Sequence, residues 1–251
     1  MTITEAAALM DAELRLADVP DYPPALNGLQ LEAPGEIRRI AAAVDACEPV
    51  VARAAEAGAN LLLVHHGMFW SGAQPVRGAQ FRKLKSAIDA GLAIYSAHIP
   101  LDVHPSLGNN ARLAAALGIP EPEPFFPWKG IDLGLRGRFA GTRDDLAATL
   151  REALGGSGVH LCPGGGESAG VVGVITGGAG AEVAAIAGCG IDTFVTGEGP
   201  HWSYTAAEEL GINVLYGGHY ATETFGVKAL AEWLSARCGA PWEFIDHPTG
   251  L

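Results

Sequence analysis

Histidines and carboxylates follow apolar segments along this chain, at the points where those segments end. The segments are short aliphatic runs of the kind that form buried strands, such as residues 61–64. Imidazoles combined with carboxylates are typical ligands of zinc, iron, manganese or nickel, and not of calcium. The residue types therefore indicate a site for divalent transition metals. Its candidate ligands are His65, His66, Asp102, His219 and Glu223.

The position of these residues, rather than their number, supports this interpretation. A His-His pair, or a histidine four residues before an acid, arises easily by chance among 8 histidines and 28 acidic residues. In open α/β sheets, however, ligands bind at the carboxyl ends of the strands, where all of these groups are expected. Gly67 lets the backbone turn there, so His65 and His66 can both reach one cavity. Carboxylates can bridge two ions about 4 Å apart, a spacing suited to hydrolysis.

The roles of the other polar residues near these segments stay open. His98, Glu198 and His201 are candidates for moving a proton during catalysis or for contacting a substrate. Glu198 could equally face water, and His201 could lie at the border of the cavity. A buried histidine is more often a core residue with satisfied hydrogen bonds, and this alternative applies to His65 and His66 as well. The remaining histidines are expected on the surface: His104, His160 and His247.

Strands and helices alternate along the chain and would position these groups. Apolar runs predict strands at residues 40–44, 61–64, 92–96, 133–140, 171–175 and 191–195, and helical patterns cover residues 4–16, 48–57, 82–90, 108–117, 143–154, 181–187 and 223–236. Thr4 and Thr222 are expected to cap the first and last of these helices. Pro100 is expected to keep residues 98–102 extended, and the Gly-rich residues 155–170 to form a loop. The alternation predicts the α/β class.

The second half of the sequence resembles the first at an offset of 132 residues for the earlier segment and 121 for the later one, which indicates an internal duplication. We therefore predict an α/β fold of two similar halves, with mixed sheets flanked by helices. Residues 1–125 would form the first half and residues 126–251 the second, joined by the proline-rich residues 120–127 into one compact unit that shares the metal site. The aligned pairs are Gly58 with Gly190, His66 with Glu198, Trp70 with Trp202, His98 with His219, and Asp102 with Glu223.

Composition limits the partners of the protein. The net charge of −12 repels nucleic acids and anionic membrane surfaces. No apolar run approaches the roughly 18 residues that a membrane-spanning helix needs. Residues 1–16 carry acidic side chains and are expected to form a helix rather than a targeting segment. The four cysteines lack C-x-x-C spacing, so we expect reduced thiols and a cytoplasmic protein that binds neither membranes nor nucleic acid.

Three motifs make the sequence similar to a known family. They are LVHHGMFW at residues 63–70, SAHIPLDVHP at residues 96–105 and GGHYATE at residues 217–223. Together they resemble the GTP cyclohydrolase 1 type 2 homologs, also called NGG-interacting-factor-like proteins, in their short bacterial branch. The resemblance covers essentially the whole chain. It implies a ring-shaped homohexamer of two similar α/β halves, and a dinuclear metal site with His98 beside the ligands His65, His66, Asp102, His219 and Glu223.

Three functional hypotheses follow. The first is a metal-dependent hydrolase that activates water to cleave a nucleotide, a phosphoester or a related small molecule. The second is a non-enzymatic metal-binding adaptor or regulatory scaffold, built as the same hexameric ring. The third is a ring threaded by nucleic acid, which the negative charge disfavours. The sequence identifies neither the substrate nor the metal.

Overall fold

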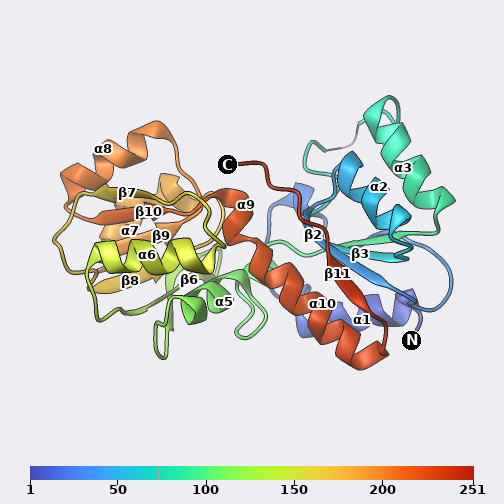
Figure 1. Ribbon diagram of the computed structural model, residues 1–251, viewed down its shortest axis with the longest axis horizontal. Coiled ribbons are helices and arrows are strands. Elements are labelled where there is room, and N and C mark those ends of the chain that lie inside the picture. The colour runs from blue at the N-terminus through green and yellow to red at the C-terminus, as the bar shows by residue number, and fades with distance from the viewer. Residues whose placement is uncertain (73) are drawn as a thin grey trace. The chain divides into compact units, whose positions relative to one another are not determined.

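The computed structural model describes residues 1–72 and 74–251, which form two compact units (Figure 1). The first unit consists of Met1–Leu101 with Gly226–His247, and the second consists of Asp102–Phe225 with Pro248–Leu251. Each unit contains one mixed β-sheet. The chain thus leaves the first unit after residue 101, builds the second, and returns to complete the first.

The sheet of the first unit has the strand order β1-β4-β3-β2-β11. Strands β2, β3 and β4 are parallel, β11 extends them in parallel beside β2, and β1 pairs with β4 in the antiparallel direction. Residues 61–65 are all buried, as expected for a strand covered on both faces. The strands are β1 Gly28–Leu31, β2 Ile40–Asp45, β3 Leu61–His66, β4 Ala93–Ser96 and β11 Trp242–Phe244.

Helices cover both faces of this sheet (Figure 1). On one face α2 (Glu48–Glu56) and α3 (Ala79–Asp89) pack apolar side chains such as Val51 against Leu62 of β3. On the other face lie α1 (Ile3–Glu13) and α10 (Thr224–Cys238), and the Tyr95 hydroxyl of β4 donates a 2.9 Å hydrogen bond to Asp11 of α1. A short 3₁₀ helix, η1 (Pro23–Ala25), precedes β1, and the one-turn helix α4 (Ile99–Asp102) follows β4.

The sheet of the second unit has the strand order β5-β6-β8-β9-β10-β7. Strands β8, β9 and β10 are parallel, whereas β5 with β6, β6 with β8, and β7 with β10 are antiparallel pairs. The strands are β5 Glu123–Trp128, β6 Ile131–Arg138, β7 His160–Pro163, β8 Val171–Val174, β9 Thr193–Thr196 and β10 Asn213–Tyr216.

Two apolar cores lie on the two faces of this second sheet. On one face α5 (Asn109–Ala116) and α6 (Arg143–Ala153) pack against β8, with Leu113, Leu150 and Val174 fully buried. On the other face η2 (Ala179–Glu182), α7 (Val183–Ala187) and α8 (His201–Leu210) pack against β9, with Ile186 and Phe194 fully buried. The one-turn helix α9 (His219–Thr222) follows β10. Among the described residues, no helix is long and apolar enough to cross a bilayer.

The predicted α/β fold with an internal duplication is confirmed. The order β1-β4-β3-β2 of the first sheet recurs as β7-β10-β9-β8 in the second, with one antiparallel edge strand and three parallel strands in each. The helices α2 and α3 have the counterparts α7 and α8. Gly58 and Gly190, which the sequence aligned, follow the first of these helices in each unit with φ of +74° and +72°.

The division into units differs from the predicted halves 1–125 and 126–251. Residues 226–247 belong to the first unit because Trp242 of β11 pairs with Ile40 of β2. Residues 102–125 belong to the second unit because Phe125 of β5 pairs with Gly134 of β6. Most of the predicted proline-rich linker is therefore strand β5. Prolines are tolerated there because β5 is an edge strand, where a missing N–H breaks no ladder.

Several local predictions were wrong. Residues 99–102 form α4 rather than an extended segment, because a proline in the first turn of a helix removes no helical hydrogen bond. Thr2, not Thr4, caps α1 through a capping box with Glu5. The Thr222 hydroxyl does not cap the last helix but donates back to the Gly218 and His219 carbonyls. The Gly-rich residues 155–170 contain strand β7.

Candidate metal centre

Three histidine rings of the first unit meet at the carboxyl end of β3 and just beyond that of β4. One ring nitrogen each of His65, His66 and His98 lies within 4.8 Å of the others. The centroid of the His65 ring is 4.8 Å from that of His66 and 4.9 Å from that of His98. Both members of the His-His pair therefore reach the same point, although neighbouring side chains in a regular strand point to opposite faces.

Gly67 explains how the chain leaves β3 immediately after these histidines. A Cβ atom at Gly67 would overlap the side chain of Gln30. Gln30 in turn accepts a 2.7 Å hydrogen bond from the Met68 N–H and donates to the Ala25 and Leu26 carbonyls, each at 3.0 Å. The glycine thus allows Gln30 to hold the turn that follows His66.

The rings of His65 and His66 are each oriented by an oxygen of the same unit. Nδ1 of His65 lies 2.9 Å from the Ala97 carbonyl oxygen, and Nδ1 of His66 lies 2.9 Å from Oδ1 of Asp45. Because a carbonyl and a carboxylate only accept hydrogen bonds, each Nδ1 carries the proton. Nε2 is then the nitrogen of each ring that can bind a metal.

His98 is held by a carboxylate that the sequence did not indicate. Its Nδ1 lies 2.8 Å from Oδ1 of Asp21, and its backbone N–H donates to Asn27 at 2.8 Å. The other Asp21 oxygen accepts from the Ile99 N–H at 3.0 Å and from Asn27 at 2.7 Å. Burial raises the pKa of Asp21, but the hydrogen bonds and the charge from His98 and its other donors outweigh burial and lower that pKa. Asp21 therefore orients His98 as an ionised group.

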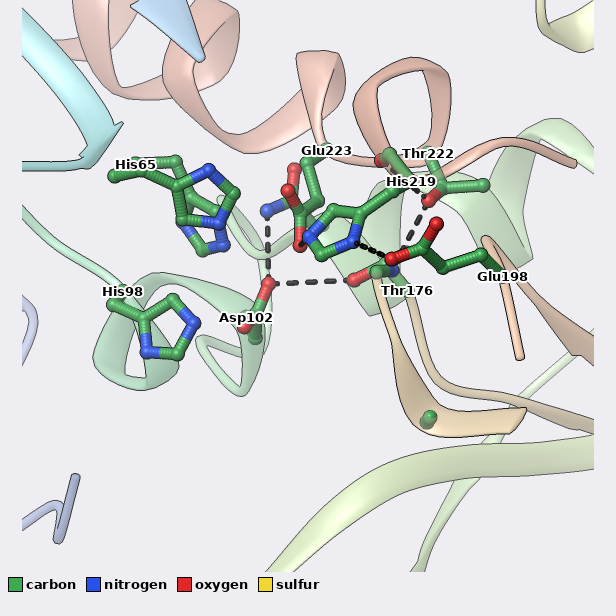
Figure 2. A network of polar contacts seen from close by, with 12 residues as sticks. His65, His98, Asp102, Thr176, Glu198, His219, Thr222 and Glu223 are labelled. Carbon is green, nitrogen blue, oxygen red and sulfur yellow. Dashed lines mark hydrogen bonds and ion pairs between the residues drawn. The ribbon is translucent and has the colours of Figure 1, made fainter. Parts of the chain in front are cut away.

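In the second unit Asp102 is 7% exposed and hydrogen-bonded (Figure 2). Its Oδ1 accepts from the Asn109 amide at 2.8 Å and from the Thr176 hydroxyl at 3.3 Å. Thr176 is fixed in turn, because its backbone N–H donates to Asn110 at 2.9 Å. These donors satisfy the hydrogen-bonding capacity of the buried Asp102 side chain.

His219 lies between two carboxylates of the same unit (Figure 2). Its Nδ1 is 2.9 Å from Oε1 of Glu198, and its Nε2 is 3.1 Å from Oε1 of Glu223. Burial lowers the pKa of His219, but the hydrogen bonds and charges of Glu223 and Glu198 outweigh burial and raise that pKa to about 9. Without a metal, the ring is therefore a cation that joins two anions at neutral pH. Glu223 itself is 3% exposed.

Glycines make room for these groups in the second unit. Gly177 follows β8 with φ of +70°, and a Cβ atom there would overlap Oε1 of Glu223. A Cβ atom at Gly197 would lie 2.7 Å from the His219 Cα. The Gly177 N–H donates to the Thr222 hydroxyl at 3.1 Å. The preceding residue, Thr176, contacts Asp102 (Figure 2). The short segment 176–177 thus contacts both Asp102 and the α9 region.

The remaining predicted residues have mixed outcomes. Glu198 orients His219 and does not merely face water. His201 begins α8, is exposed, and lines a cavity together with Glu198. His160 is exposed as expected, but lies in strand β7 rather than a loop, and His104 accepts hydrogen bonds from two backbone N–H groups of its own loop. No pattern in the sequence indicated Asp21 and Asp45, whose partners lie far along the chain.

The donor groups in each unit fit divalent transition metals. The first unit offers imidazoles whose Nδ1 atoms are already engaged, and the second offers one imidazole and two buried carboxylates. Such hydrogen bonds on the far side of a ligand are typical of metal-binding histidines. Nitrogen and carboxylate donors together suit zinc, iron, manganese or nickel.

Comparisons with known proteins point to one family. The model of the Duf34/NIF3 (NGG1p interacting factor 3) family matches residues 1–249. A protein of Deinococcus radiodurans named GTP cyclohydrolase 1 type 2 homolog is 43% identical over 242 residues, which cover 95% of this chain and 90% of that protein. A homolog of the same name from Pyrococcus abyssi is 39% identical, with 98% of each chain covered. A crystal structure of a Thermus thermophilus protein is 40% identical, with a TM-score of 0.89 and complete coverage of both chains.

Proposed function

The chain belongs to the Duf34/NIF3 family, and from this premise we propose that it binds two divalent transition-metal ions and uses them to hydrolyse a small nucleotide or phosphoester. The observation that carries the proposal is the hydrogen bonding of the imidazole rings. In the three proposed histidine ligands Nδ1 is engaged by an oxygen of the same unit, so that Nε2 is the metal-binding atom. The three pairs are His65 with Ala97, His66 with Asp45 and His219 with Glu198.

The ligands we propose for the metal ions are His65, His66, Asp102, His219 and Glu223. The bound ions would supply acidification of water and stabilisation of negative charge on phosphate oxygens. Their positive charge also compensates locally for the negative charge of the protein, which otherwise repels a phosphate-bearing substrate.

His98 would transfer the proton in this reaction. Its Nδ1 is engaged by Asp21, which orients the ring, so that Nε2 is the atom that would accept and return the proton. This arrangement favours the hydrolase over a non-enzymatic adaptor or scaffold, because a purely structural site needs no group for proton transfer beside its ligands. His201 lies farther along the same chain segment as Glu198 and would contact the substrate.

We also propose the assembly that the family resemblance implies, a ring-shaped homohexamer located in the cytoplasm. Light scattering coupled to size-exclusion chromatography tests the assembly directly. A hexamer would give six times the 25.9 kDa mass of one chain. A monomer or dimer at micromolar concentration would contradict the ring without affecting the metal assignment.

Metal content tests the proposed function first. Elemental mass spectrometry of protein purified without a metal-affinity tag should find about two equivalents of transition metal per chain. The double variant His65→Ala/Glu223→Ala should lose them, whereas His247→Ala should keep them because His247 lies outside the proposed ligand set. Metal-loaded protein should then hydrolyse a phosphodiester such as bis(p-nitrophenyl) phosphate, and His98→Gln should hydrolyse it at least about a hundredfold more slowly.

Two results would contradict this proposal at different levels. A parent protein that takes up no metal, even after anaerobic reconstitution, would overturn the metal site and the hydrolase together. A parent that binds two metals but turns over no nucleotide or phosphoester would overturn the hydrolase alone, and the metal-binding scaffold would replace it.

A further inference from the structure

A cavity of about 380 Å³ in the second unit is bordered by aromatic side chains and by Glu198. Strand β7 contributes His160, strand β10 contributes Tyr216, and helix α8 contributes Tyr204. The segment between β9 and α8 contributes Glu198 and the backbone of residues 197–200. The volume lies at the small end of the range for ligand sites, which suits a ligand the size of a nucleoside.

The aromatic rings form one wall of this cavity. The His160 ring centroid is 5.6 Å from that of Tyr204 and 6.2 Å from that of Tyr216, with the ring planes inclined by 41° and 32°. The Tyr216 hydroxyl is 2.7 Å from Oγ of Ser203, which donates to the Pro200 carbonyl at 2.7 Å. These contacts fix the Tyr216 ring in place. The wall therefore consists of aromatic rings, and such rings bind flat ligands by stacking.

Glu198 gives the cavity a hydrogen-bond acceptor. Its Oε1 accepts from His219, yet its side chain is 46% exposed, and the residue lines the cavity. A carboxylate has about four acceptor positions, so Glu198 can accept N–H groups from a ligand while it orients His219. No lysine or arginine is among the described residues that line the cavity, so its walls do not suit a phosphate group.

We propose that this cavity binds a nucleobase, stacked on the rings of His160 and Tyr204 with its amino group directed to Glu198. A nucleobase combines the two features that the cavity selects, a flat π surface and N–H donors at one edge. This inference rests on the proposed function, because it names the part of a nucleotide substrate that would lie away from the metals. Glu198 would then contact the base and orient a metal ligand at once.

Nucleoside binding to the metal-free protein tests this site separately from the metals. The protein is treated with EDTA, dialysed, and titrated with guanosine, adenosine, cytidine and uridine by ligand-observed NMR. We expect saturable binding with a Kd of about 1 mM or tighter for the three nucleosides with an exocyclic amino group. Uridine, which lacks that amino group, should bind more weakly.

Variants of the residues that line the cavity test whether nucleosides bind there. Tyr204→Leu and His160→Ala should each weaken nucleoside binding by about tenfold, the loss expected when one stacking surface is removed. His160 is exposed, so its replacement should leave the fold intact. Phe81→Leu is the matched control, because Phe81 is an aromatic residue of α3 in the first unit with 50% exposure. It should bind nucleosides as the parent does.

Several outcomes would overturn the proposal. The first is that the folded protein binds no nucleoside, with or without metal. The second is that the parent and both cavity variants bind nucleosides equally. The third is that choline binds more tightly than every nucleoside. The last result would identify a site for organic cations instead. Failure of the proposed function would give a different result. If the protein bound no metal but still bound nucleosides in a Tyr204-dependent way, the hydrolase would be excluded and the nucleobase site would be supported.

Discussion

Oε1 of Glu198 and Nδ1 of His219 are joined by a hydrogen bond of 2.9 Å, which orients the opposite nitrogen of the ring toward Glu223 at 3.1 Å. In the first unit Asp21 engages His98, the sequence counterpart of His219, in the same way at 2.8 Å. The two acids occupy unrelated sequence positions. The duplicated histidines have thus retained one chemical arrangement, an acid on Nδ1, with a different acid in each half.

Replacing Glu198 tests the value of this arrangement for metal binding. Glu198→Gln keeps an oxygen that can accept the hydrogen bond from Nδ1 but removes the charge that strengthens it. We expect metal affinity to fall by about ten- to a hundredfold, the usual effect of losing such a partner. Competition with a chromophoric chelator measures the change. Glu209→Gln on α8 is the control, because Glu209 is exposed, and equal affinity of both variants would contradict the role of Glu198.

The raised pKa of His219 predicts how the metal-free protein responds to pH. Burial lowers that pKa, but Glu223 and Glu198 outweigh burial and raise it from 6.5 to about 9. Because the folded protein binds this proton more tightly than the unfolded chain, the added stability is complete below about pH 6.5. It is lost as the pH rises through about 9. Urea unfolding of EDTA-treated protein should therefore show a lower free energy of unfolding at pH 9.5 than at pH 6.5.

A variant separates this effect from other titrating groups. His219→Gln should show a smaller decrease in the free energy of unfolding over the same pH range, because it lacks the proton that is released. An equal decrease in the variant and the parent would assign the pH dependence to other residues and contradict the raised pKa.

The sequence predicted the histidines at the strand ends well, but it did not predict the acidic residues that form hydrogen bonds with them. His65 and His66 were placed correctly at the end of β3, because an uninterrupted aliphatic run before a glycine is a local signal. Asp21 and Asp45 were missed because their contacts with His98 and His66 join residues 77 and 21 positions apart, and these contacts exist only after the chain has folded. The family assignment did not need those contacts, since the three motifs are local as well.

The boundary between the units was also mispredicted because it depends on contacts between residues far apart in the sequence. The pairing of Trp242–Phe244 with β2 adds the end of the chain to the first sheet, and three half-buried residues carry no periodic pattern that reveals this pairing. Pro124 and Pro127 argued against a strand at residues 123–128, since only the position of β5 at the sheet edge makes them acceptable. Tertiary position, which local propensity does not contain, decided both cases.

Asp102 offers a test of a buried carboxylate as a metal ligand. Asp102→Asn keeps an oxygen for the hydrogen bonds from Asn109 and Thr176 but removes the charge, so metal content should fall while the thermal unfolding temperature changes little. Asp102→Ala also removes the acceptor of the Asn109 amide and should cost about 1–3 kcal/mol of stability. Elemental analysis and calorimetry measure the two effects. Asp132→Asn, at an exposed position of β6, is the control, and unchanged metal content in Asp102→Asn would exclude Asp102 as a ligand.

Gly177 and Gly190 form a matched pair for testing the space beside Glu223. Both adopt the left-handed conformation, with φ of +70° and +72°, so alanine at either position should cost about 1–2 kcal/mol of backbone strain. Only at Gly177 would the new Cβ overlap Oε1 of Glu223, because nothing lies within 4 Å of a Cβ at Gly190. Gly190→Ala should therefore lose stability in urea but keep its metal, whereas Gly177→Ala should lose both. If the two variants lost metal equally, general destabilisation would account for the loss, and the close approach of Gly177 to Glu223 would have no bearing on metal binding.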